Sequence, residues 1–532
     1  MTPDMTAAKS TTALAKTVVD AAIARHRELD DAEQHQVMLY DIAHAASAIE
    51  MCRSVIDDGK KGPAEGALAC AFIADVVAEL GAKTIGREHL WGIEVGALDS
   101  AREFLIAYRD PEFLASLADL DPPSHLDDDF EMVADTFRRF ADDKVAPAAE
   151  HIHRTDSDIP EELIQGLAEL GCFGLSVPEE YGGFATGGES DYFGMVIATE
   201  ELSRASLGAG GSLITRPEIL TRALERGGTE AQKQKWLPQI ATAETMCAVA
   251  VTEPDYGSDV AQLKVTATPT RGGWHINGVK TWCTFAGRAN VMMLLARTDP
   301  DKSKGHRGLS LFIVPKESTA GHQFELHQDA GGRMEGRAIP TIGYRGMHSF
   351  EVAFEDWFVE AENLVGGDEG LGRGFYLQMA GFENGRLQTA ARAVGVMQAA
   401  FEAATTYAAD RKVFGQPIGQ YQLTRAKLGR MAAIIRAARQ YNYAVAVMMA
   451  KGGGTLEASM VKAYVCKAAE WVTREAMQIH GGFGYAEEYP VSRLFVDARV
   501  LSIFEGADET LCLKLIIRRL LKAEPAGEVR AP

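Results

Sequence analysis

The sequence predicts an α+β protein whose segments follow one another in the order helical, helical, β and helical. The main evidence is a change of period. Apolar residues recur every three or four positions over most of the chain, whereas residues 246–359 contain short β-rich runs and alternation. Clusters of Pro and Gly separate these segments. A chain of 532 residues is long enough for about three or four domains.

The N-terminal segment is expected to be a helical extension that spans residues 1–122. Its predicted apolar helix face consists of residues at spacings of 4, 3 and 4: Met38, Ile42, Ala45 and Ile49. A helix cannot continue through Asp121-Pro122-Pro123-Ser124, and the acidic run Asp127–Asp129 favours a new helix start. We therefore expect a domain boundary at this point.

Three further domains are expected after this boundary. Residues 123–245 keep the helical period and form a helical domain. Residues 246–365 form a β domain with the strand runs Cys247–Val251, Val291–Leu295 and Leu309–Val314. Residues 366–532 return to a helical pattern that is rich in Ala, Met and Leu.

Charge and hydropathy disfavour several classes of protein. Lys and Arg total 54 and Asp and Glu total 74, so the net charge is −20 and nucleic acid is not expected as a partner. The longest apolar runs, such as Tyr443–Ala450, are far shorter than the roughly 20 residues that span a bilayer. The N-terminus lacks the features of a secretory signal, so no membrane partner and a cytoplasmic location are expected.

Cysteine spacing and short motifs narrow the chemistry further. The seven cysteines form no C-x-x-C pair, so we expect them to be reduced and structural, and we expect no metal site. The motifs of zinc hydrolases, serine hydrolases, P-loop proteins and Rossmann dinucleotide domains do not occur.

A polar turn and an aromatic strand in the β domain are the first candidates for a cofactor site. The segment Val251–Asp259 offers hydroxyls and backbone N–H groups to an anionic ligand, although such a turn is more often only structural. Trp282 and Thr284 are two positions apart on a predicted strand and are expected to share a face. The indole ring could then lie against a flat cofactor while the hydroxyl of Thr284 bonds its edge.

These segments resemble the acyl-CoA dehydrogenase family of flavoenzymes, which use FAD. The family has a V-T-E-P-x-x-G-S-D strand and a W-x-T strand in its middle domain. Two further matches are Asp410–Gly415, like its D/E-R-K-x-F-G motif, and Gln478–Tyr485, like its Q-I-x-G-G-x-G-Y/F loop. The resemblance implies a helical N-terminal domain, a middle β-barrel domain and a C-terminal four-helix bundle, with residues 1–122 as an extra extension.

The resemblance also implies which residues bind FAD. In the family, Asp410–Gly415 and Gln478–Tyr485 serve the flavin of a neighbouring subunit, and Arg411 would face the pyrophosphate, which suits its guanidinium group. The alternative is an ordinary surface arginine and a glycine turn that ends a helix. The full set of expected FAD contacts is Val251, Thr252, Ser258, Trp282, Thr284, Arg411, Phe414, Gln478, Gly481, Gly482, Ala507 and Glu509.

Glu505 is the expected catalytic residue. Ile503-Phe504-Glu505-Gly506 resembles the family's I-Y/F-E-G-T segment, whose glutamate removes the α proton of the substrate. Without the resemblance, a lone Glu near a helix start would be read as a cap or a solvated charge. The family's Thr is replaced by Ala507, so one flavin contact is expected to be lost or taken over by Asp508 or Glu509.

Other residues are expected to bind the substrate. Phe382-Glu383-Asn384-Gly385-Arg386 resembles the family stretch that holds the CoA part, so Glu383 and Arg386 are candidates, with a helical ion pair as the alternative. Ser258 and Gly506 are also expected to bind the substrate.

The extension and three short segments resemble the branch of the family that oxidises (2S)-methylsuccinyl-CoA to mesaconyl-CoA in the ethylmalonyl-CoA pathway. These segments are Gly211–Arg216, Gly343–Met347 and Leu387–Arg392. Such a substrate carries a free carboxylate, which needs a cation or several donors when buried. Arg216 is the candidate, and the alternative is an exposed arginine that caps a helix beginning at Pro217.

Several alternatives remain open at this stage. A general short-chain or branched-chain acyl-CoA dehydrogenase would have the same motifs, and so would an acyl-CoA oxidase that passes electrons to oxygen. Electron-transferring flavoprotein is the expected acceptor, and either a homodimer or a homotetramer fits the sequence. A non-catalytic scaffold and a flavin monooxygenase relative are disfavoured, because Glu505 and the expected flavin contacts are present.

Overall fold

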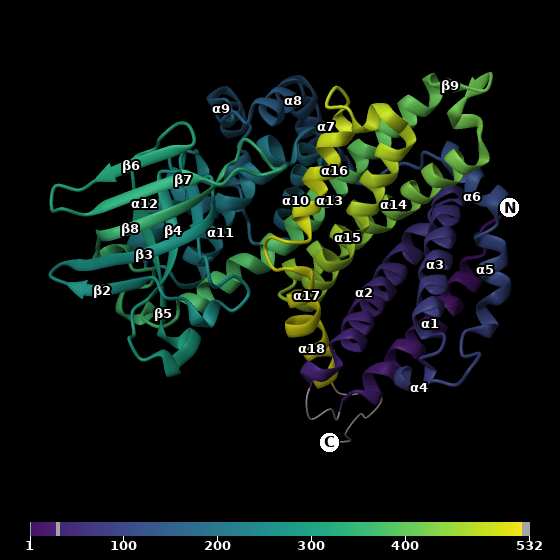
Figure 1. The fold of residues 1–532 in the computed structure, drawn as a ribbon, viewed down its shortest axis with the longest axis horizontal. Coiled ribbons are helices and arrows are strands. Elements are labelled where there is room, and N and C mark those ends of the chain that lie inside the picture. Colours follow the sequence, from purple (N-terminus) through teal and green to yellow (C-terminus); the bar gives the residue numbers. More distant parts are fainter. Residues whose placement is uncertain (1, 28–31, 524–532) are drawn as a thin grey trace. The chain divides into compact units, whose positions relative to one another are not determined.

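The structure is a computed structural model that describes residues 2–27 and 32–523. It divides into two compact units, whose elements are labelled in Figure 1. Unit 1 consists of Met1–His125, Met397–Met449 and Gly453–Pro532. Unit 2 consists of Leu126–Val396 and Ala450–Gly452. The two units are described separately.

Unit 1 begins with the helices of the N-terminal extension. They are α1 (Met5–Arg25), α2 (Gln36–Gly59), α3 (Pro63–Thr84), α4 (Glu88–Trp91), α5 (Arg102–Tyr108) and α6 (Pro111–Ser116). The predicted apolar face lies on α2, where Met38, Ile42, Ala45 and Ile49 are all buried. This helix packs against α1, α3 and α15. The expectation for this face is confirmed.

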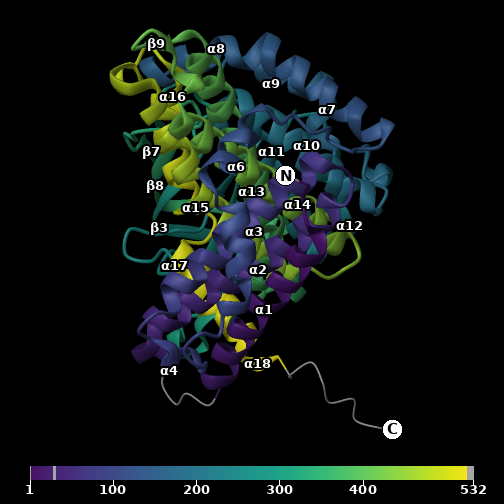
Figure 2. The same ribbon diagram turned by 90° about the vertical axis from the view of Figure 1, so that its right-hand side faces the viewer.

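The remaining helices of unit 1 come from the C-terminal part of the chain. They are α14 (Gln422–Ala450), α15 (Thr455–His480), α16 (Pro490–Leu501), α17 (Asp508–Thr510) and α18 (Ile517–Lys522), with a short hairpin of β9 (Lys412–Val413) and β10 (Gln416–Pro417). Figure 2 shows α2 and α3 of the extension beside α14 and α15. The long helix α13 (Gly374–Asp410) has residues in both units.

Unit 2 starts with six helices. They are α7 (Asp128–Phe140), α8 (Ala146–Thr155), α9 (Glu161–Glu169), α10 (Glu189–Ala205), α11 (Ser212–Gly227) and α12 (Glu230–Ala241). The predicted helix start is confirmed, because the side chain of Asp127 caps α7 by accepting a hydrogen bond from the backbone N–H of Phe130. Thr229 and Gln232 form a capping box at the start of α12.

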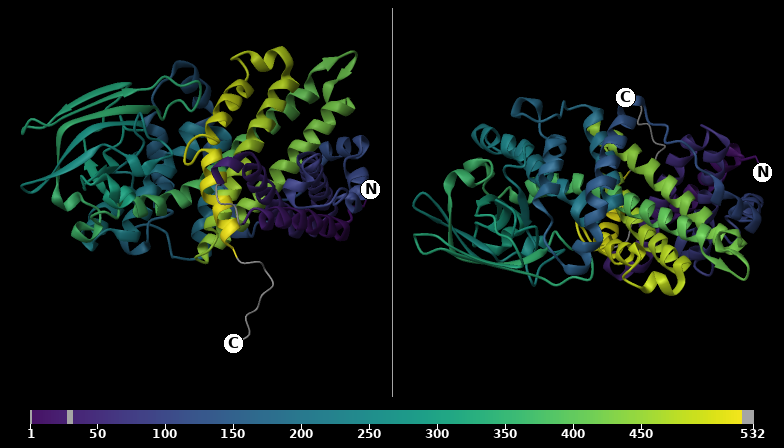
Figure 3. Two further views of the ribbon diagram at one scale, coloured as in Figure 1. Left: turned by 60° about the horizontal axis from the view of Figure 1, so that its bottom comes forward. Right: turned by 90° about the horizontal axis from the view of Figure 1, so that it is seen from above.

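The β part of unit 2 is an eight-stranded sheet. Its strands are β1 (Cys247–Ala250), β2 (Thr266–Thr270), β3 (Gly273–Thr284), β4 (Val291–Arg297), β5 (Leu309–Pro315), β6 (Gln323–His327), β7 (Arg333–Ala338) and β8 (Ser349–Glu360). The order is β1-β4-β2-β3-β8-β7-β6, and β5 pairs with β4. The strands curve rather than lie flat, as Figure 3 shows. One face packs on α11 and α12 residues, including Leu224 and Leu237, and the other carries its own core around Phe350.

The expected α+β order of helical, helical, β and helical parts is therefore confirmed. All seven cysteines are free and buried, in agreement with a structural role. Within the described residues, no helix is both long enough and apolar enough to cross a bilayer.

Candidate active site

The aromatic strand of unit 2 is interrupted at the expected cofactor contacts. Lys280 pairs with Val352 and Cys283 with Phe350, so β3 has one more residue than β8 between these pairs. Trp282 takes a positive φ of 57° in this bulge and is 54% exposed, whereas Thr284 is 7% exposed and lies 3.1 Å from the Ser349 hydroxyl. Thr284 pairs with Ser349, and Trp282 lies in the bulge opposite Glu351, two positions further along β8, so this register is consistent with the prediction that Trp282 and Thr284 share a face.

The polar turn that begins at Val251 is fixed by a buried ion pair. Lys280 Nζ lies 2.9 Å from Glu253 Oε1 and donates a 2.8 Å hydrogen bond to the carbonyl of Val251. The carbonyl of Thr252 accepts from the backbone N–H of Thr281 at 2.8 Å. Burial lowers the pKa of Lys280 to about 8, and the carboxylate of Glu253 opposes this shift. Thr252 is left half-buried, and Ser258 is exposed.

Unit 1 brings together the two motifs that the resemblance assigns to FAD. The guanidinium carbon of Arg411 lies 6.0 Å from the ring centroid of Phe483. Just before Arg411, the ring of Tyr407 stacks on His480 with a centroid distance of 4.3 Å. Two segments that are distant in sequence therefore form one surface.

This surface is open. Phe414 has a φ of 51° and is 95% exposed, and Gln478 and Arg411 are exposed beside it. Gly481 and Gly482 are also exposed, and a Cβ added at either position would meet nothing within 4 Å. A flat or phosphorylated ligand can therefore approach the backbone closely. These features of unit 1 fit FAD.

The expected base lies in a strained turn of unit 1. Glu505 has a positive φ of 54° and is followed by Gly506 at 103°. A Cβ at Gly506 would lie 2.9 Å from the side chain of Leu511, and the positive φ itself favours glycine at this position. A left-handed conformation at a residue other than glycine is unfavourable by about 1–3 kcal/mol and marks functional turns. The N-cap of α17 is Ala507, so Glu505 is not the cap of that helix.

Two contacts from α15 hold this turn. The buried Lys462 donates a 2.6 Å hydrogen bond from Nζ to the carbonyl of Gly506. The hydroxyl of Ser502 donates a 2.5 Å hydrogen bond to Glu470. The turn also closes on itself, because the N–H of Asp508 donates to the carbonyl of Ser502 at 3.1 Å. Glu505 therefore projects from a backbone that is fixed on both sides.

The residues after the base differ in their surroundings. Asp508 is buried and accepts hydrogen bonds from Tyr40 and His44 of the extension, so its carboxylate is already engaged within unit 1. Glu509 is exposed, and Ala507 is half-buried. Of the two expected replacements for the family's Thr, Glu509 is therefore the more accessible.

Arg216 lies inside a helix of unit 2 and is 5% exposed. Its Nη2 donates a 3.3 Å hydrogen bond to the hydroxyl of Tyr344, which is also buried. The alternative of an exposed arginine at a helix start is wrong. Helix α11 begins at Ser212, and Pro217 lies inside it.

The three segments that resemble the methylsuccinyl-CoA branch meet around this arginine. Tyr344 belongs to the second segment. Arg392, from the third segment, donates a 3.2 Å hydrogen bond to the hydroxyl of Ser212, in the first segment. Nearby, Glu218 of α11 accepts hydrogen bonds from Asn384 and Gln388 of α13. A buried polar seam therefore joins α11 and α13. On α13, Glu383 is half-buried and Arg386 is buried.

Sequence patterns did not identify several residues that organise these sites. The ion pair of Glu253 and Lys280 joins the polar turn to β3. The sequence pattern around Val251 and Thr252 did not predict this pair. Lys462 is a lysine in an ordinary amphipathic pattern, and Tyr40 and Asp508 lie near opposite ends of the chain. The only available signal was residue type, since buried lysine and glutamate are rare unless paired.

The chain is similar to known proteins over most of its length. Models of the acyl-CoA dehydrogenase N-terminal, middle and C-terminal domains match residues 127–244, 248–357 and 372–521. The (2S)-methylsuccinyl-CoA dehydrogenase of Cereibacter sphaeroides is 43% identical over 454 residues, which are 85% of this chain and 79% of that protein.

Solved structures agree with these matches. Butyryl-CoA dehydrogenase of Megasphaera elsdenii has a TM-score of 0.68 and 30% identity, over 76% of this chain and 100% of that chain. A chain from a structural study of the electron transferring flavoprotein of Acidaminococcus fermentans has a TM-score of 0.67 and 31% identity, over 76% of this chain and 100% of that chain. The chain belongs to the acyl-CoA dehydrogenase family and is an FAD-dependent oxidoreductase.

Proposed function

We propose that the protein oxidises a short, branched acyl-CoA thioester, namely (2S)-methylsuccinyl-CoA, to the α,β-unsaturated product mesaconyl-CoA. Glu505 is the base that removes the α proton. The observation that carries this assignment is the left-handed turn at Glu505 and Gly506, which Lys462 holds by the Gly506 carbonyl. A strained turn fixed by buried contacts is typical of a catalytic position.

The reaction needs a base and a means to stabilise negative charge. The α C–H of a thioester is a weak acid, so the carboxylate must be held at the α carbon and donors must already face the developing enolate oxygen. In this proposal Glu505 takes the proton while its backbone N–H faces the thioester oxygen. FAD supplies the acceptor for the hydride that leaves the β carbon. One C–H bond breaks at each carbon, and a double bond forms between them.

The polar seam of unit 2 supports a diacid substrate. A substrate carboxylate that is buried needs a cation or several donors. Arg216 donates to Tyr344, and the carboxylate of the acyl group is proposed as a further partner. The three segments that meet here are those that resemble the methylsuccinyl-CoA branch, and the 43% identical relative has that activity by name.

We also propose electron-transferring flavoprotein as the electron acceptor and a homo-oligomer as the working form. Both follow from the family, in which segments like Asp410–Gly415 and Gln478–Tyr485 serve a neighbouring subunit. Reduction rates with electron-transferring flavoprotein and with oxygen separate a dehydrogenase from an oxidase. Light scattering separates a dimer from a tetramer.

The test of the function is reduction of the bound flavin. The FAD-loaded protein is mixed separately with methylsuccinyl-CoA, butyryl-CoA and isobutyryl-CoA, and the flavin absorbance is followed for wild type and Glu505→Gln. We expect methylsuccinyl-CoA to bleach the flavin fastest. We expect Glu505→Gln to retain FAD and to lose bleaching by at least about 100-fold, in line with the loss of a general base.

The exposed Glu103 of α5 gives a matched control, and Glu103→Gln should bleach like wild type. Faster bleaching by butyryl-CoA or isobutyryl-CoA would favour the general acyl-CoA dehydrogenase and leave Glu505 as the base. Full bleaching of the Glu505→Gln protein would refute the base assignment. Bound FAD that no thioester reduces would favour the non-catalytic scaffold.

A further inference from the structure

The N-terminal extension reaches the segment that carries Glu505. His44 Nε2 lies 3.0 Å from Oδ2 of Asp508, and the hydroxyl of Tyr40 donates a hydrogen bond to the same oxygen. Both residues belong to α2, one turn apart on the same face. Asp508 is the third residue after Glu505, and its backbone N–H closes the turn on Ser502. The family models begin at residue 127, so α2 lies outside the part of the chain that they match.

The contacts of Asp508 are buried and complementary in charge. Asp508 is 5% exposed, and Lys467 of α15 lies 3.7 Å from it and donates a 2.7 Å hydrogen bond to the Tyr40 hydroxyl. Burial alone would raise the pKa of Asp508, but the hydrogen bonds of His44 and Tyr40 and the charge of Lys467 lower it. The carboxylate therefore stays ionised and accepts strong, charge-assisted hydrogen bonds.

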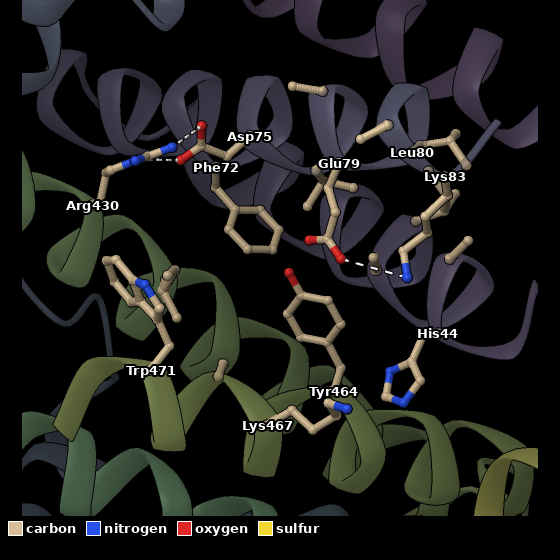
Figure 4. Close-up of a pocket in the computed structure, with 18 of the residues that line it drawn as sticks. His44, Phe72, Asp75, Glu79, Leu80, Lys83, Arg430, Tyr464, Lys467 and Trp471 are labelled. Carbon is tan, nitrogen blue, oxygen red and sulfur yellow. Dashed lines mark hydrogen bonds and ion pairs between the residues drawn. The ribbon is translucent and has the colours of Figure 1, made fainter. Parts of the chain in front are cut away.

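These contacts lie at the edge of a pocket between the extension and the C-terminal helices. A cavity of about 700 Å³ lies between α2 and α3 on one side and α14 and α15 on the other, and Figure 4 shows its lining. Arg430 and Asp75 pair near one end of the drawn pocket, and His44 and Lys467 lie near the other. Polar contacts of the extension therefore lie at both ends of this pocket.

The turn needs such anchors because it is strained. Glu505 and Gly506 both have positive φ, and a strained backbone persists only where its surroundings fix it. Lys462 holds the Gly506 carbonyl, Glu470 holds Ser502, and α2 holds Asp508. The first two anchors come from the C-terminal helices. The third comes from the extension.

A metal ion is the other chemistry that this cluster suggests. His44, Asp508 and Cys512 offer ligand atoms within 4.8 Å of one another. The ammonium of Lys467 already lies 3.7 Å from the same carboxylate, and the Tyr40 hydroxyl occupies the same oxygen. A second cation at this point would be repelled, so the contacts favour a hydrogen-bonded anchor.

We propose that Tyr40 and His44 of the N-terminal extension are positioning residues that hold the catalytic turn through Asp508 and so fix the orientation of Glu505. This inference rests on the proposed role of Glu505 as the base. The extension then influences catalysis indirectly, because its contacts with the Asp508 carboxylate fix the turn that carries Glu505.

The test compares four variants of the FAD-loaded full chain. Tyr40→Phe/His44→Leu removes both donors, Asp508→Asn changes the acceptor, and His44→Gln keeps an N–H where the imidazole Nε2 lies. We expect the first two to lower kcat by about 10- to 100-fold, as small misplacements of a catalytic group do, with KM within about threefold. We expect His44→Gln to keep most of the activity.

The fourth variant, Asp75→Asn, is the control. It weakens the pair between the extension and Arg430, so it shows the effect of a weaker contact between the extension and α14 away from the turn.

Hydrogen exchange provides a readout that is independent of activity. The N–H groups of Asp508 and Leu511 close the turn and the following helix, so they should exchange faster in Tyr40→Phe/His44→Leu than in wild type or Asp75→Asn. The proposal is overturned if kcat and exchange of residues 502–511 stay as in wild type, or if Asp75→Asn lowers kcat equally. Activity that survives Glu505→Gln would instead refute the base assignment, while faster exchange in the double variant would still show that α2 holds the turn.

Discussion

The ammonium group of Lys462 donates a 2.6 Å hydrogen bond to the carbonyl oxygen of Gly506, the residue that follows Glu505. Lys462 is fully buried on α15, whereas Glu505 lies in the turn that links α16 to α17. One buried cation therefore fixes the backbone next to the proposed base, and this relationship leads to the first prediction.

Lys462→Met should reduce both activity and stability. The substitution keeps a chain of similar length but leaves the Gly506 carbonyl without this donor, which is unfavourable by about 1–3 kcal/mol when the acceptor stays buried. We expect kcat to fall by about 10-fold or more and the free energy of unfolding to fall by the amount above. Stopped-flow flavin reduction and urea unfolding measure the two effects. Lys451→Met changes an exposed lysine and should change neither, and a wild-type kcat in Lys462→Met would contradict the prediction.

Arg216→Met should change substrate preference more than overall activity. Arg216 is buried beside Tyr344, so its loss removes the proposed partner of a substrate carboxylate. A charge-assisted hydrogen bond is worth about 1.5–3 kcal/mol, so kcat/KM for methylsuccinyl-CoA should fall by about 10- to 100-fold. The value for butyryl-CoA should fall much less, because butyryl-CoA lacks the carboxylate.

The control for this comparison is Arg226→Met, at the exposed end of α11. It should leave the ratio of the two kcat/KM values unchanged. Equal losses on both thioesters in Arg216→Met would assign Arg216 a structural role in the buried polar seam.

Much of the fold could be predicted from local patterns. The period of Met38, Ile42, Ala45 and Ile49 predicted the buried face of α2, and the acidic run before Phe130 predicted the start of α7. Such features depend on residues within one or two turns of each other, so the sequence alone contains the necessary information.

The geometry of the candidate site was less predictable. The alternation of β3 gave no sign of the bulge that turns Trp282 outward, because a bulge depends on how β3 pairs with β8. Pro217 suggested a helix start, but α11 begins at Ser212, directly after the π-helical turn Leu207–Gly211, and contains Pro217. The contact of Tyr40 with Asp508 depends on the packing of the extension, which no local pattern encodes.

Glu253→Gln should loosen the polar turn of unit 2 and weaken FAD binding. Glu253 accepts hydrogen bonds from the N–H groups of Lys264 and Val265 at 2.7 and 2.9 Å and pairs with the buried Lys280. Removing one partner of a buried pair leaves an uncompensated charge and is unfavourable by about 3–5 kcal/mol. Urea unfolding measures the loss of stability, and the fluorescence of released flavin measures the loss of FAD binding.

Asp255→Asn, which weakens only an exposed pair with Lys264, should keep the stability and FAD binding of the wild type. Unchanged stability in Glu253→Gln would contradict the prediction.

Glu218 should make the stability of the protein fall as the pH rises towards neutrality. Burial raises the pKa of Glu218 from 4.5 to about 7, although Arg222 and Asn384 oppose the shift. The folded protein therefore holds a proton on Glu218 between these two pH values, whereas the unfolded chain has released it. The stability contributed by this proton is fully present below about pH 4.5 and is lost as the pH rises through about 7.

Glu218→Gln should remove this pH dependence. One pKa unit corresponds to about 1.4 kcal/mol, so the variant should gain up to about 3 kcal/mol relative to wild type between pH 4.5 and 7.5. The measurement is the free energy of unfolding in urea at a series of pH values, expressed as the difference between variant and wild type. Taking this difference removes the contribution of the other carboxylates. One of them is Asp508, whose lowered pKa makes stability rise with pH.

Glu169→Gln, on the exposed end of α9, should give a difference that does not vary with pH. A flat difference for Glu218→Gln as well would mean that Arg222 keeps Glu218 ionised when folded.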